Sequence, residues 1–315
     1  MSYTGPEFDP PHLRRSPRRR TLAVALAALV PGALLGWLAY EALGGSGDGG
    51  PGRVTEAASS GQASPSGGAD GDGKPAAPVP PSATASAPAG TGSLKGKVVV
   101  IDPGHNPGNA EHTAEINRQV DVGTHRKECD TTGTSTNSGY SEAAFTLDVA
   151  HRLRALLQRQ GATVRLTQDA DRPYGPCVDE RARIGNAAHA DAVVSIHADG
   201  SGSGNRGFHV ILPGEVHEGA ADTRAIVGPS RDLGKLVAAD FGRVTGSAPS
   251  NYLGDGTGLV TREDLGGLNL STVPKVFIEC GNMRDSKDAA LLTSGAWRQR
   301  AAQGISEGIV SFLRG

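Results

Sequence analysis

The apolar and polar positions divide the chain into three regions: an uncharged apolar run, a stretch of small residues, and a region of alternating strand and helix patterns. In the third region, short β-branched apolar runs predict buried strands over 97–102, 163–167, 192–196, 207–212 and 275–279. Apolar residues at helical spacing predict helices over 141–161, 178–190, 231–244 and 297–313. This alternation predicts an α/β fold: a single domain over 94–315 with an open, mostly parallel sheet flanked by helices.

The uncharged run covers residues 21–40, and about twenty apolar residues suffice for a helix to cross a bilayer. Five arginines within residues 1–20 precede it, which predicts a basic cytoplasmic N-terminus with the rest of the chain outside. We expect a transmembrane anchor or signal segment over 21–43. An uncleaved anchor is favoured because the run is longer than a signal-peptide core and no small-x-small site follows it. The protein is then extracytoplasmic and held at the membrane, or secreted if the segment is cleaved.

The stretch of small residues covers 44–93, where 38 of 50 residues are Gly, Ala, Ser or Pro. This composition cannot bury enough apolar surface to offset the entropy of ordering the chain, so it predicts a disordered linker. A flexible chain of this length has an average span of about 40 Å and would tether the globular part to a retained anchor.

Charge excludes a nucleic-acid partner. The chain has 31 basic and 33 acidic residues, and no basic stripe follows the N-terminal arginines.

The chain has three cysteines. Cys280 lies in an apolar run and is expected to be a buried thiol. Cys129 and Cys177 lie in polar, turn-rich segments, and we predict a disulfide between them because export permits one. A metal site is the alternative, but neither cysteine belongs to a Cys-x-x-Cys motif.

Three predicted strands end in residues capable of metal or acid–base chemistry. His105 follows the strand at 97–102, His197 follows the strand at 192–196, and Glu279 ends the last strand. In an open α/β sheet, ligands bind at the carboxyl ends of the strands, and Glu142 begins a helix that starts at the same rim. Two histidines and a carboxylate form a catalytic zinc set with a fourth position open for water, and a further carboxylate can act as a base.

Each of these residues also has a simpler interpretation. A single histidine after a strand is commonly a hydrogen-bonded loop residue, and Glu142 fits a carboxylate in the first turn of a helix. An ion pair with an arginine would satisfy Glu279. Six other histidines compete as ligands, although none directly follows a strongly apolar strand: His112, His125, His151, His189, His209 and His217.

Six segments together point to a family: VVVIDPGHNPG, GYSEAAF, TQDAD, RARIGNAA, VVSIHADG and PKVFIECGNM. In this order they resemble the zinc-dependent N-acetylmuramoyl-L-alanine amidases of bacterial cell-wall remodelling, over residues 97–313. The resemblance implies one Zn²⁺ per chain on His105, Glu142 and His197, with Glu279 as the catalytic glutamate. It also implies hydrolysis of the amide between N-acetylmuramic acid and L-alanine, with peptidoglycan or a muropeptide as the substrate partner.

The chain departs from the family pattern in two places. The 36 residues between His105 and Glu142 are more than the family typically has. This insertion, at 106–140, carries Cys129, and we expect the disulfide to pin it beside the site as a flap. In the TQDAD segment, Gln168 stands where the family usually has an arginine, which leaves the local ion pairing open.

Arg262 and Asn269 precede the last strand and are candidate ligands for a carboxylate or carbonyl group of the stem peptide. A surface ion pair of Arg262 with Glu263 or Asp264 is the alternative. Two other functions stay open: a zinc peptidase that acts within the stem peptide, and a non-catalytic regulatory module that binds the cell wall.

Overall fold

The structure, a computed structural model, describes residues 93–315. The predicted basic N-terminus, the predicted anchor over 21–43 and nearly all of the predicted linker lie outside the described residues. Within residues 93–315, no helix has both the length and the apolar character needed to cross a membrane.

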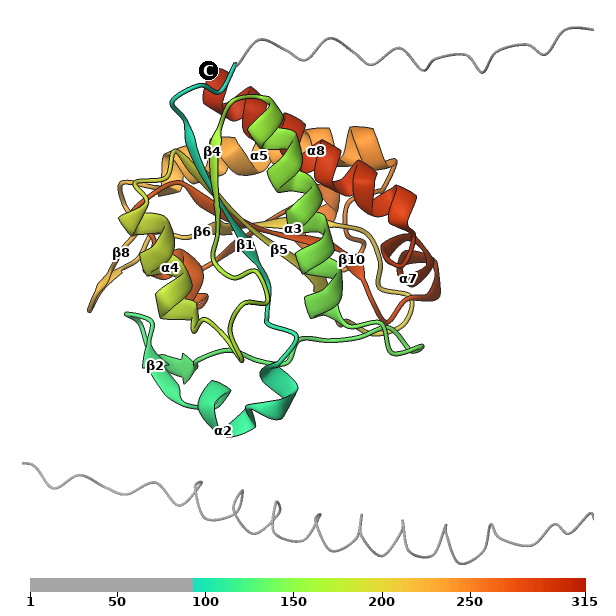
Figure 1. Cartoon of the computed structure of the whole chain (residues 1–315), viewed down its shortest axis with the longest axis horizontal. Coiled ribbons are helices and arrows are strands. Elements are labelled where there is room, and N and C mark those ends of the chain that lie inside the picture. Colours follow the sequence, from blue (N-terminus) through green and yellow to red (C-terminus); the bar gives the residue numbers. More distant parts are fainter. Residues whose placement is uncertain (1–92) are drawn as a thin grey trace, which may run out of the picture. The chain divides into compact units, whose positions relative to one another are not determined.

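A six-stranded sheet lies at the centre of residues 93–315, in the order β4-β1-β5-β10-β6-β9 (Figure 1). The strands are β1 (Val98–Pro103), β4 (Thr163–Leu166), β5 (Ala192–Asp199), β6 (His209–Pro213), β9 (Leu259–Arg262) and β10 (Lys275–Asn282). The strands β4, β1, β5 and β10 are parallel, whereas β6 runs antiparallel to β10 and β9 runs parallel to β6. The sheet is therefore mixed with a parallel majority, which agrees with the α/β prediction.

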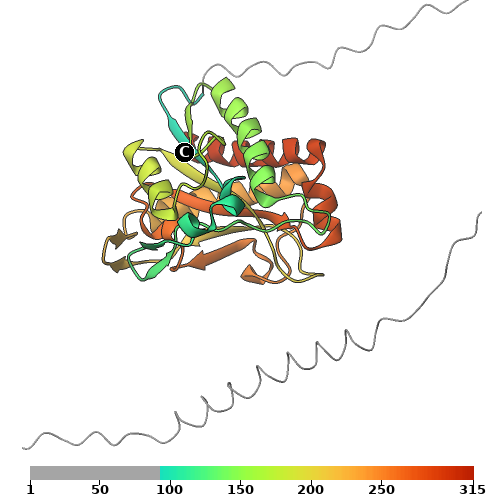
Figure 2. The same cartoon turned by 60° about the horizontal axis from the view of Figure 1, so that its bottom comes forward.

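Side chains alternate between the two faces of the sheet. Val99 and Ile101 of β1 pack into the main core, which also takes up the apolar side chains of three long helices. These helices are α3 (Glu142–Arg159), α5 (Val227–Thr245) and α8 (Gly295–Arg314), and they lie together on one side of the sheet (Figure 2). Val100 and Val193 point the other way, toward Ile184 of α4 (Val178–Ala187).

This alternation decides where the polar groups lie. In β5, Val193 faces α4, so Ser195 and His197 face the same side. In β10, Val276 and Ile278 belong to the main core, so Lys275, Phe277 and Glu279 face away from it. One face of the sheet therefore packs into the apolar core. The other face carries buried charged residues, with His197 and Glu279 toward the ends of their strands.

Local signals in the sequence set the limits of the long helices. The Ser141 side chain accepts a hydrogen bond from the Ala144 backbone N–H at the start of α3, and Ser294 accepts one from Trp297 at the start of α8. The α5 helix ends at Gly246, whose φ of 72° is readily adopted only by glycine. The predicted long helices are therefore present within a few residues of their expected bounds.

The insertion at 106–140 folds into small elements at the end of the sheet where β1 ends (Figure 1). They are η1 (Asn109–Glu111), α2 (Thr113–Ile116) and a hairpin of β2 (Gln119–Asp121) and β3 (Arg126–Glu128). Five further short elements lie between the main ones: β7 (His217–Glu218), β8 (Ala221–Asp222), η2 (Gly254–Gly256), α6 (Gly266–Asn269) and α7 (Ser286–Leu292). The sequence pattern predicted neither the hairpin nor β9.

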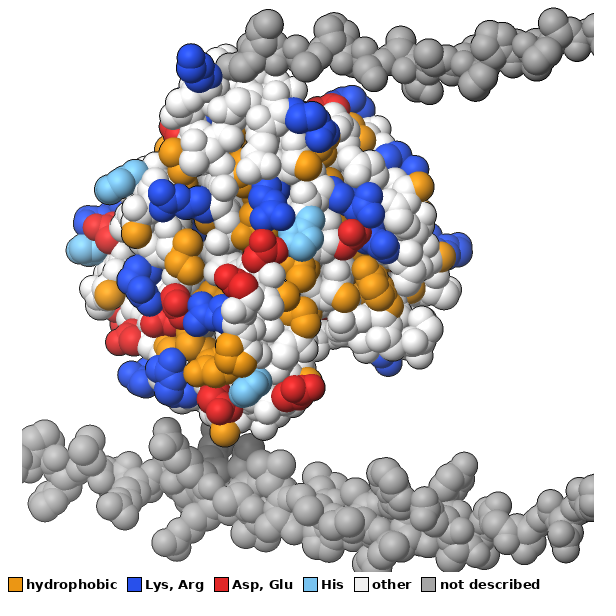
Figure 3. All heavy atoms as spheres, viewed as in Figure 1, with side chains coloured by type: hydrophobic (Ala, Val, Ile, Leu, Met, Phe, Trp, Pro, Cys, Tyr) orange, Lys and Arg blue, Asp and Glu red, His pale blue; other side chains and the backbone are white. Residues whose placement is uncertain are grey.

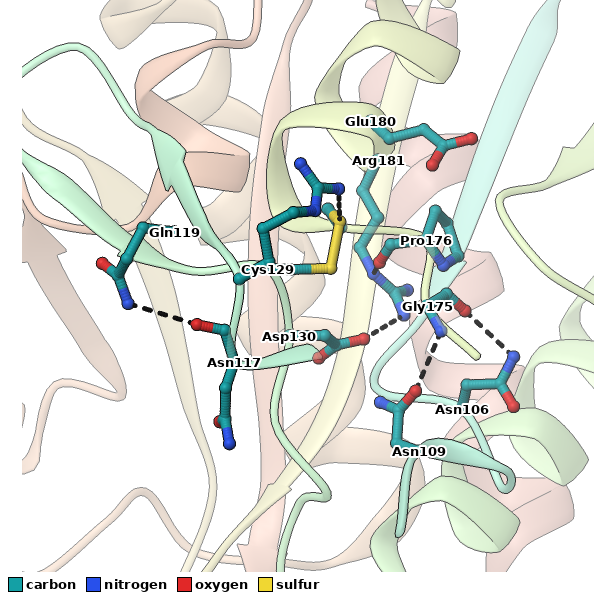
Figure 4. The surroundings of a disulfide bond; sticks show 12 residues. Asn106, Asn109, Asn117, Gln119, Cys129, Asp130, Gly175, Pro176, Glu180 and Arg181 are labelled. Carbon is teal, nitrogen blue, oxygen red and sulfur yellow. Dashed lines mark hydrogen bonds and ion pairs between the residues drawn. A yellow bond between two sulfur atoms is a disulfide. The ribbon is translucent and has the colours of Figure 1, made fainter. Parts of the chain in front are cut away.

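A disulfide joins Cys129, in the insertion, to Cys177, at the start of α4 (Figure 4). This is the pair that the sequence analysis expects, and Cys280 is a buried free thiol. Val120, Val122 and Val178 pack around the two sulfur atoms in a small second core. The insertion is therefore fastened covalently beside the sheet.

We predict that removal of this disulfide lowers the free energy of unfolding by about 2–4 kcal/mol, because the bond closes a long loop in the unfolded chain. The two cysteines are 48 residues apart. The measurement is urea unfolding of oxidised protein against a Cys129→Ser/Cys177→Ser variant, with reduced wild type as the control. Thiol titration of the denatured protein is expected to find one free cysteine before reduction and three after it. Three before reduction would contradict the pairing.

Candidate active site

The carboxyl ends of β1, β5 and β10 meet at one rim of the sheet. Glu279 of β10 pairs in register with His197 of β5, and Asp102 of β1 pairs with Ser195 two residues before His197. His105 lies in the turn after β1, with a φ of 60°. The rim therefore gathers three residues that the sequence predicted from separate strand ends.

Glu142 joins this group because α3 starts at the same rim. Its Oε1 atom lies 2.9 Å from Nδ1 of His197, and its Oε2 atom lies 3.3 Å from Nε2 of His105. Oε1 also accepts a hydrogen bond from the Ala198 backbone N–H, and Oε2 accepts one from that of Thr134. One ligand-capable atom from each of His105, Glu142 and His197 lies within 4.8 Å of the other two.

Two glycines permit this close approach. A Cβ atom on Gly104 would lie 2.4 Å from the ring of His197, and one on Gly133 would lie 2.7 Å from the ring of His105 and 2.8 Å from Oε2 of Glu142. Both contacts are too short for any side chain, and Gly133 also has a φ of +71°. The insertion therefore contributes to the wall of the site through Gly133.

Glu279 is partly buried beside the cluster, and its Oε2 atom is buried without a hydrogen-bond partner in the described residues. Burial, and then the negative charges of Glu142 and Asp199, raise the pKa of Glu279 well above its ordinary value. Such a carboxylate binds a proton more strongly than an exposed one does, and this suits a base in a reaction near neutral pH. Among residues 93–315, Glu279 forms no ion pair, which was its simpler interpretation.

A cleft of roughly 340 Å³ opens over the rim and is lined by His105, Glu142, His197 and Glu279. Its lining also includes Lys127 and Glu128 of the hairpin, and Arg262, Leu265 and Gly267.

On the face of the described residues shown in Figure 3, basic and acidic side chains are interspersed, and neither forms a continuous stripe.

The two predicted substrate-binding residues differ in position. Arg262 lines the cleft and also forms an ion pair with Asp264, which was the alternative interpretation. Asn269 is 1% exposed and does not line the cleft. Its side-chain amide donates hydrogen bonds to the backbone carbonyl groups of Val122 and Glu263, so it joins the hairpin to the segment before α6. This position gives no support to substrate binding by Asn269.

The other histidines stay outside the cluster. His209 is buried opposite Glu279 in the antiparallel pair of β10 and β6, but it belongs to neither the cluster nor the cleft lining. His151 contacts the carboxylate of Asp169 on the surface of α3, as expected for a helix-surface residue. The two histidines chosen from the strand ends are therefore those that the structure brings together.

Sequence reasoning missed the charged residues beneath the site. Asp102 is fully buried between Lys275 and Arg181, at 3.0 Å and 2.8 Å, and it also accepts hydrogen bonds from Thr167 and Ser195. Burial disfavours the charged form of Asp102, but the two cations outweigh this effect and lower its pKa strongly. The signal in the sequence was weak, because a lysine at the start of a strand is usually exposed.

Gln168 fills the position where the family usually has an arginine. Its side-chain amide donates a hydrogen bond to the His105 backbone carbonyl group at 3.0 Å. Arg181 donates to the same carbonyl group, also at 3.0 Å. The backbone of His105 is therefore held from two sides.

A cluster of two histidines and a carboxylate, beside a buried free carboxylate at the carboxyl ends of strands, is the arrangement of a metal-dependent hydrolase. Comparison with known proteins identifies the family of hydrolases to which the chain belongs. The chain belongs to the N-acetylmuramoyl-L-alanine amidase family, whose model Amidase_3 matches residues 99–311. It is therefore an enzyme that cleaves the amide between N-acetylmuramic acid and L-alanine in peptidoglycan.

Its relatives include mycobacterial amidases. The N-acetylmuramoyl-L-alanine amidase Rv3717 of Mycobacterium tuberculosis is 42% identical over 230 residues, which cover 72% of this chain and 91% of the relative. The crystal structure of the amidase Ami1 from Mycobacterium smegmatis has a TM-score of 0.65 and 40% identity, over 70% of this chain and 98% of that one. Ami1 from Mycobacterium abscessus has a TM-score of 0.64 and 40% identity, over 70% and 100%.

Proposed function

We propose that this amidase holds one Zn²⁺ on His105, Glu142 and His197 and uses Glu279 as its general base. The observation that carries the proposal is the close grouping of three ligand-capable atoms, all within 4.8 Å of one another, beside an unpaired buried carboxylate oxygen. Each oxygen of the Glu142 carboxylate faces one histidine: Oε1 lies 2.9 Å from His197 and Oε2 lies 3.3 Å from His105. Two imidazole rings and a carboxylate are ligand types that zinc prefers, so these three residues would hold the ion.

When bound, the metal would polarise the scissile carbonyl group and make water more acidic. Glu279 then takes a proton from the attacking water as the water adds to the lactyl carbonyl carbon. The same carboxyl group later delivers that proton to the departing amine of L-alanine. The raised pKa of Glu279 favours this transfer, because the group must both take up and release a proton.

Arg262 is the residue that we propose for binding a carboxylate of the stem peptide. It lines the cleft, its side chain is 42% exposed, and its partner Asp264 is itself exposed. A substrate carboxylate can therefore replace Asp264 on the guanidinium group without desolvating a buried ion.

We predict that Arg262→Gln raises KM about tenfold, with a smaller change in kcat, since a hydrogen bond to a charged group contributes about 1.5–3 kcal/mol. Steady-state kinetics on a soluble muropeptide measure this effect. Arg224→Gln is the control, because Arg224 forms a similar exposed pair with Asp222. An unchanged KM in Arg262→Gln would remove this residue from the substrate site.

We also infer that the enzyme acts outside the cytoplasm, where its substrate lies. Residues 21–43 would anchor it to the membrane, and the linker would let it reach the wall. This part of the proposal rests on the sequence alone.

Mass spectrometry of digested muropeptides tests the function. Zinc-loaded protein is expected to release intact lactyl-muramic acid and a peptide with a free L-alanine N-terminus, and chelator-stripped protein is expected to release neither. Cleavage within the stem peptide would instead indicate the zinc peptidase, and wall binding without release would indicate the non-catalytic module.

A further inference from the structure

The environment of His105 fixes which of its ring nitrogens carries the proton. Nδ1 lies 3.0 Å from the Thr131 backbone carbonyl oxygen and 3.2 Å from Oδ1 of Asp130. A carbonyl oxygen only accepts hydrogen bonds, and so does an ionised carboxylate, so Nδ1 must be the donor. In the neutral ring, the lone pair is then on Nε2, the atom that faces Glu142.

Asp130 is itself held in place. Its Oδ2 atom accepts a hydrogen bond from Arg181 at 3.0 Å, and its Oδ1 atom accepts one from the Thr131 backbone N–H at 2.8 Å. Arg181 is 5% exposed, and it also donates to Asp102 and to the backbone carbonyl groups of Pro103, His105 and Pro176. These contacts hold the Asp130 carboxylate between the guanidinium group of Arg181 and the ring of His105.

The disulfide joins the two segments that carry this pair. Asp130 directly follows Cys129, and the Arg181 backbone N–H donates to the carbonyl oxygen of Cys177 at 2.9 Å. The Val178 backbone N–H donates to the carbonyl oxygen of Cys129 at 2.7 Å, so the segments are also hydrogen-bonded beside the sulfur atoms. In Figure 4, the Asp130 carboxylate points from the segment after Cys129 toward the guanidinium group of Arg181.

We propose that Asp130 is the positioning residue of His105: it fixes the ring with its proton on Nδ1, and the Cys129–Cys177 disulfide holds Asp130 against Arg181. This inference rests on the proposed role of His105 as a metal ligand. The loss of such an outer carboxylate typically weakens metal binding about 10–100-fold. A purely structural Asp130–Arg181 ion pair would affect stability and leave metal binding unchanged.

The test compares zinc affinity, by chelator competition at fixed pH, and the visible spectrum of Co²⁺-loaded protein. Asp130→Ala is expected to weaken zinc binding about 10–100-fold and to change the Co²⁺ spectrum, because the ring of His105 loses the carboxylate that holds Nδ1 together with the Thr131 carbonyl group. Asp130→Asn retains an accepting oxygen of the same reach, so we expect a smaller loss and a spectrum like that of wild type. Asp148→Asn is the control, since Asp148 forms ion pairs with Arg152 and Arg298 outside the cleft.

The contribution of the disulfide is measured in the same assay. Cys129→Ser/Cys177→Ser is expected to weaken zinc binding. In this double variant, the further substitution Asp130→Ala is expected to reduce zinc affinity by a smaller factor than it does in wild type, because the two effects are coupled. Fully additive losses would overturn the role of the disulfide. Asp130→Ala and Asp130→Asn proteins that bind zinc as tightly as wild type, with an unchanged Co²⁺ spectrum, would overturn the role of Asp130. Failure of wild type to bind zinc would overturn the proposed function itself.

Discussion

Glu279→Gln is expected to lower kcat about 10²–10⁴-fold while zinc stays bound at one ion per chain. General-base catalysis typically contributes a factor of this size, and an amide cannot take up the proton. The substitution preserves shape and removes a carboxylate whose Oε2 atom is buried without a hydrogen-bond partner in the described residues. We therefore expect the variant to be at least as stable as wild type, because burying an unpaired ionisable group costs free energy.

Turnover of a muropeptide and zinc content of the dialysed protein measure this effect together. Glu218→Gln is the matched control, because Glu218 is exposed on β7 and does not line the cleft. A Glu279→Gln enzyme with wild-type kcat would contradict the assignment of the base. A variant that loses both zinc and activity would place Glu279 among the ligands instead.

Glu142→Ala or His197→Ala is expected to abolish zinc retention and, with it, amidase activity. Glu142 contacts both histidines, so its loss removes one ligand and leaves the other two without a common partner. A loss of affinity of about 10–100-fold is typical when a residue that only hydrogen-bonds a ligand is removed. Loss of a direct ligand should weaken zinc binding by more than this. Metal analysis after dialysis and muropeptide turnover are the measurements.

His151→Ala is the control for these ligand variants. His151 is also a histidine beside a carboxylate, but it lies on the surface of α3, away from the cluster. Stoichiometric zinc in both ligand variants would contradict the proposed metal site. Loss of zinc in His151→Ala alone would place the metal elsewhere.

The site residues could be predicted because each follows a strong local signal. The strands before His105 and His197 are continuous apolar runs, and Glu279 ends a third such run. Parallel strands deliver their carboxyl ends to one rim, so separate local patterns converge on one place. The Ser141 cap placed Glu142 at the start of its helix, and the resemblance to the amidase family then implied its role as a ligand.

The residues that hold the site could not be predicted in this way. Asp130 and Arg181 are 51 positions apart, and only the folded chain, with its disulfide, makes them neighbours. Lys275 is 1% exposed at the start of β10 because Asp102 lies beside it, a pairing across 173 positions. The pattern within a short stretch of sequence cannot predict contacts between residues that are so far apart in the chain.

The strand β9 and the β2–β3 hairpin were missed for a related reason. Leu259–Arg262 is short and partly exposed, and its strand geometry comes from pairing with β6 at the edge of the sheet. The hairpin strands are three residues each and mostly exposed. Asn269, which we predicted as a substrate ligand, hydrogen-bonds the turn of this hairpin, a contact that the sequence pattern did not predict.

The central claim is that one zinc ion lies on His105, Glu142 and His197, with Glu279 free beside it. The most direct measurement is an anomalous difference map at the zinc edge from crystals of the zinc-loaded protein. We expect a single peak, about 2.0–2.2 Å from one atom of each of the three side chains and too far from Glu279 for a bond. A peak elsewhere, or one bonded to the Glu279 carboxylate, would contradict the account.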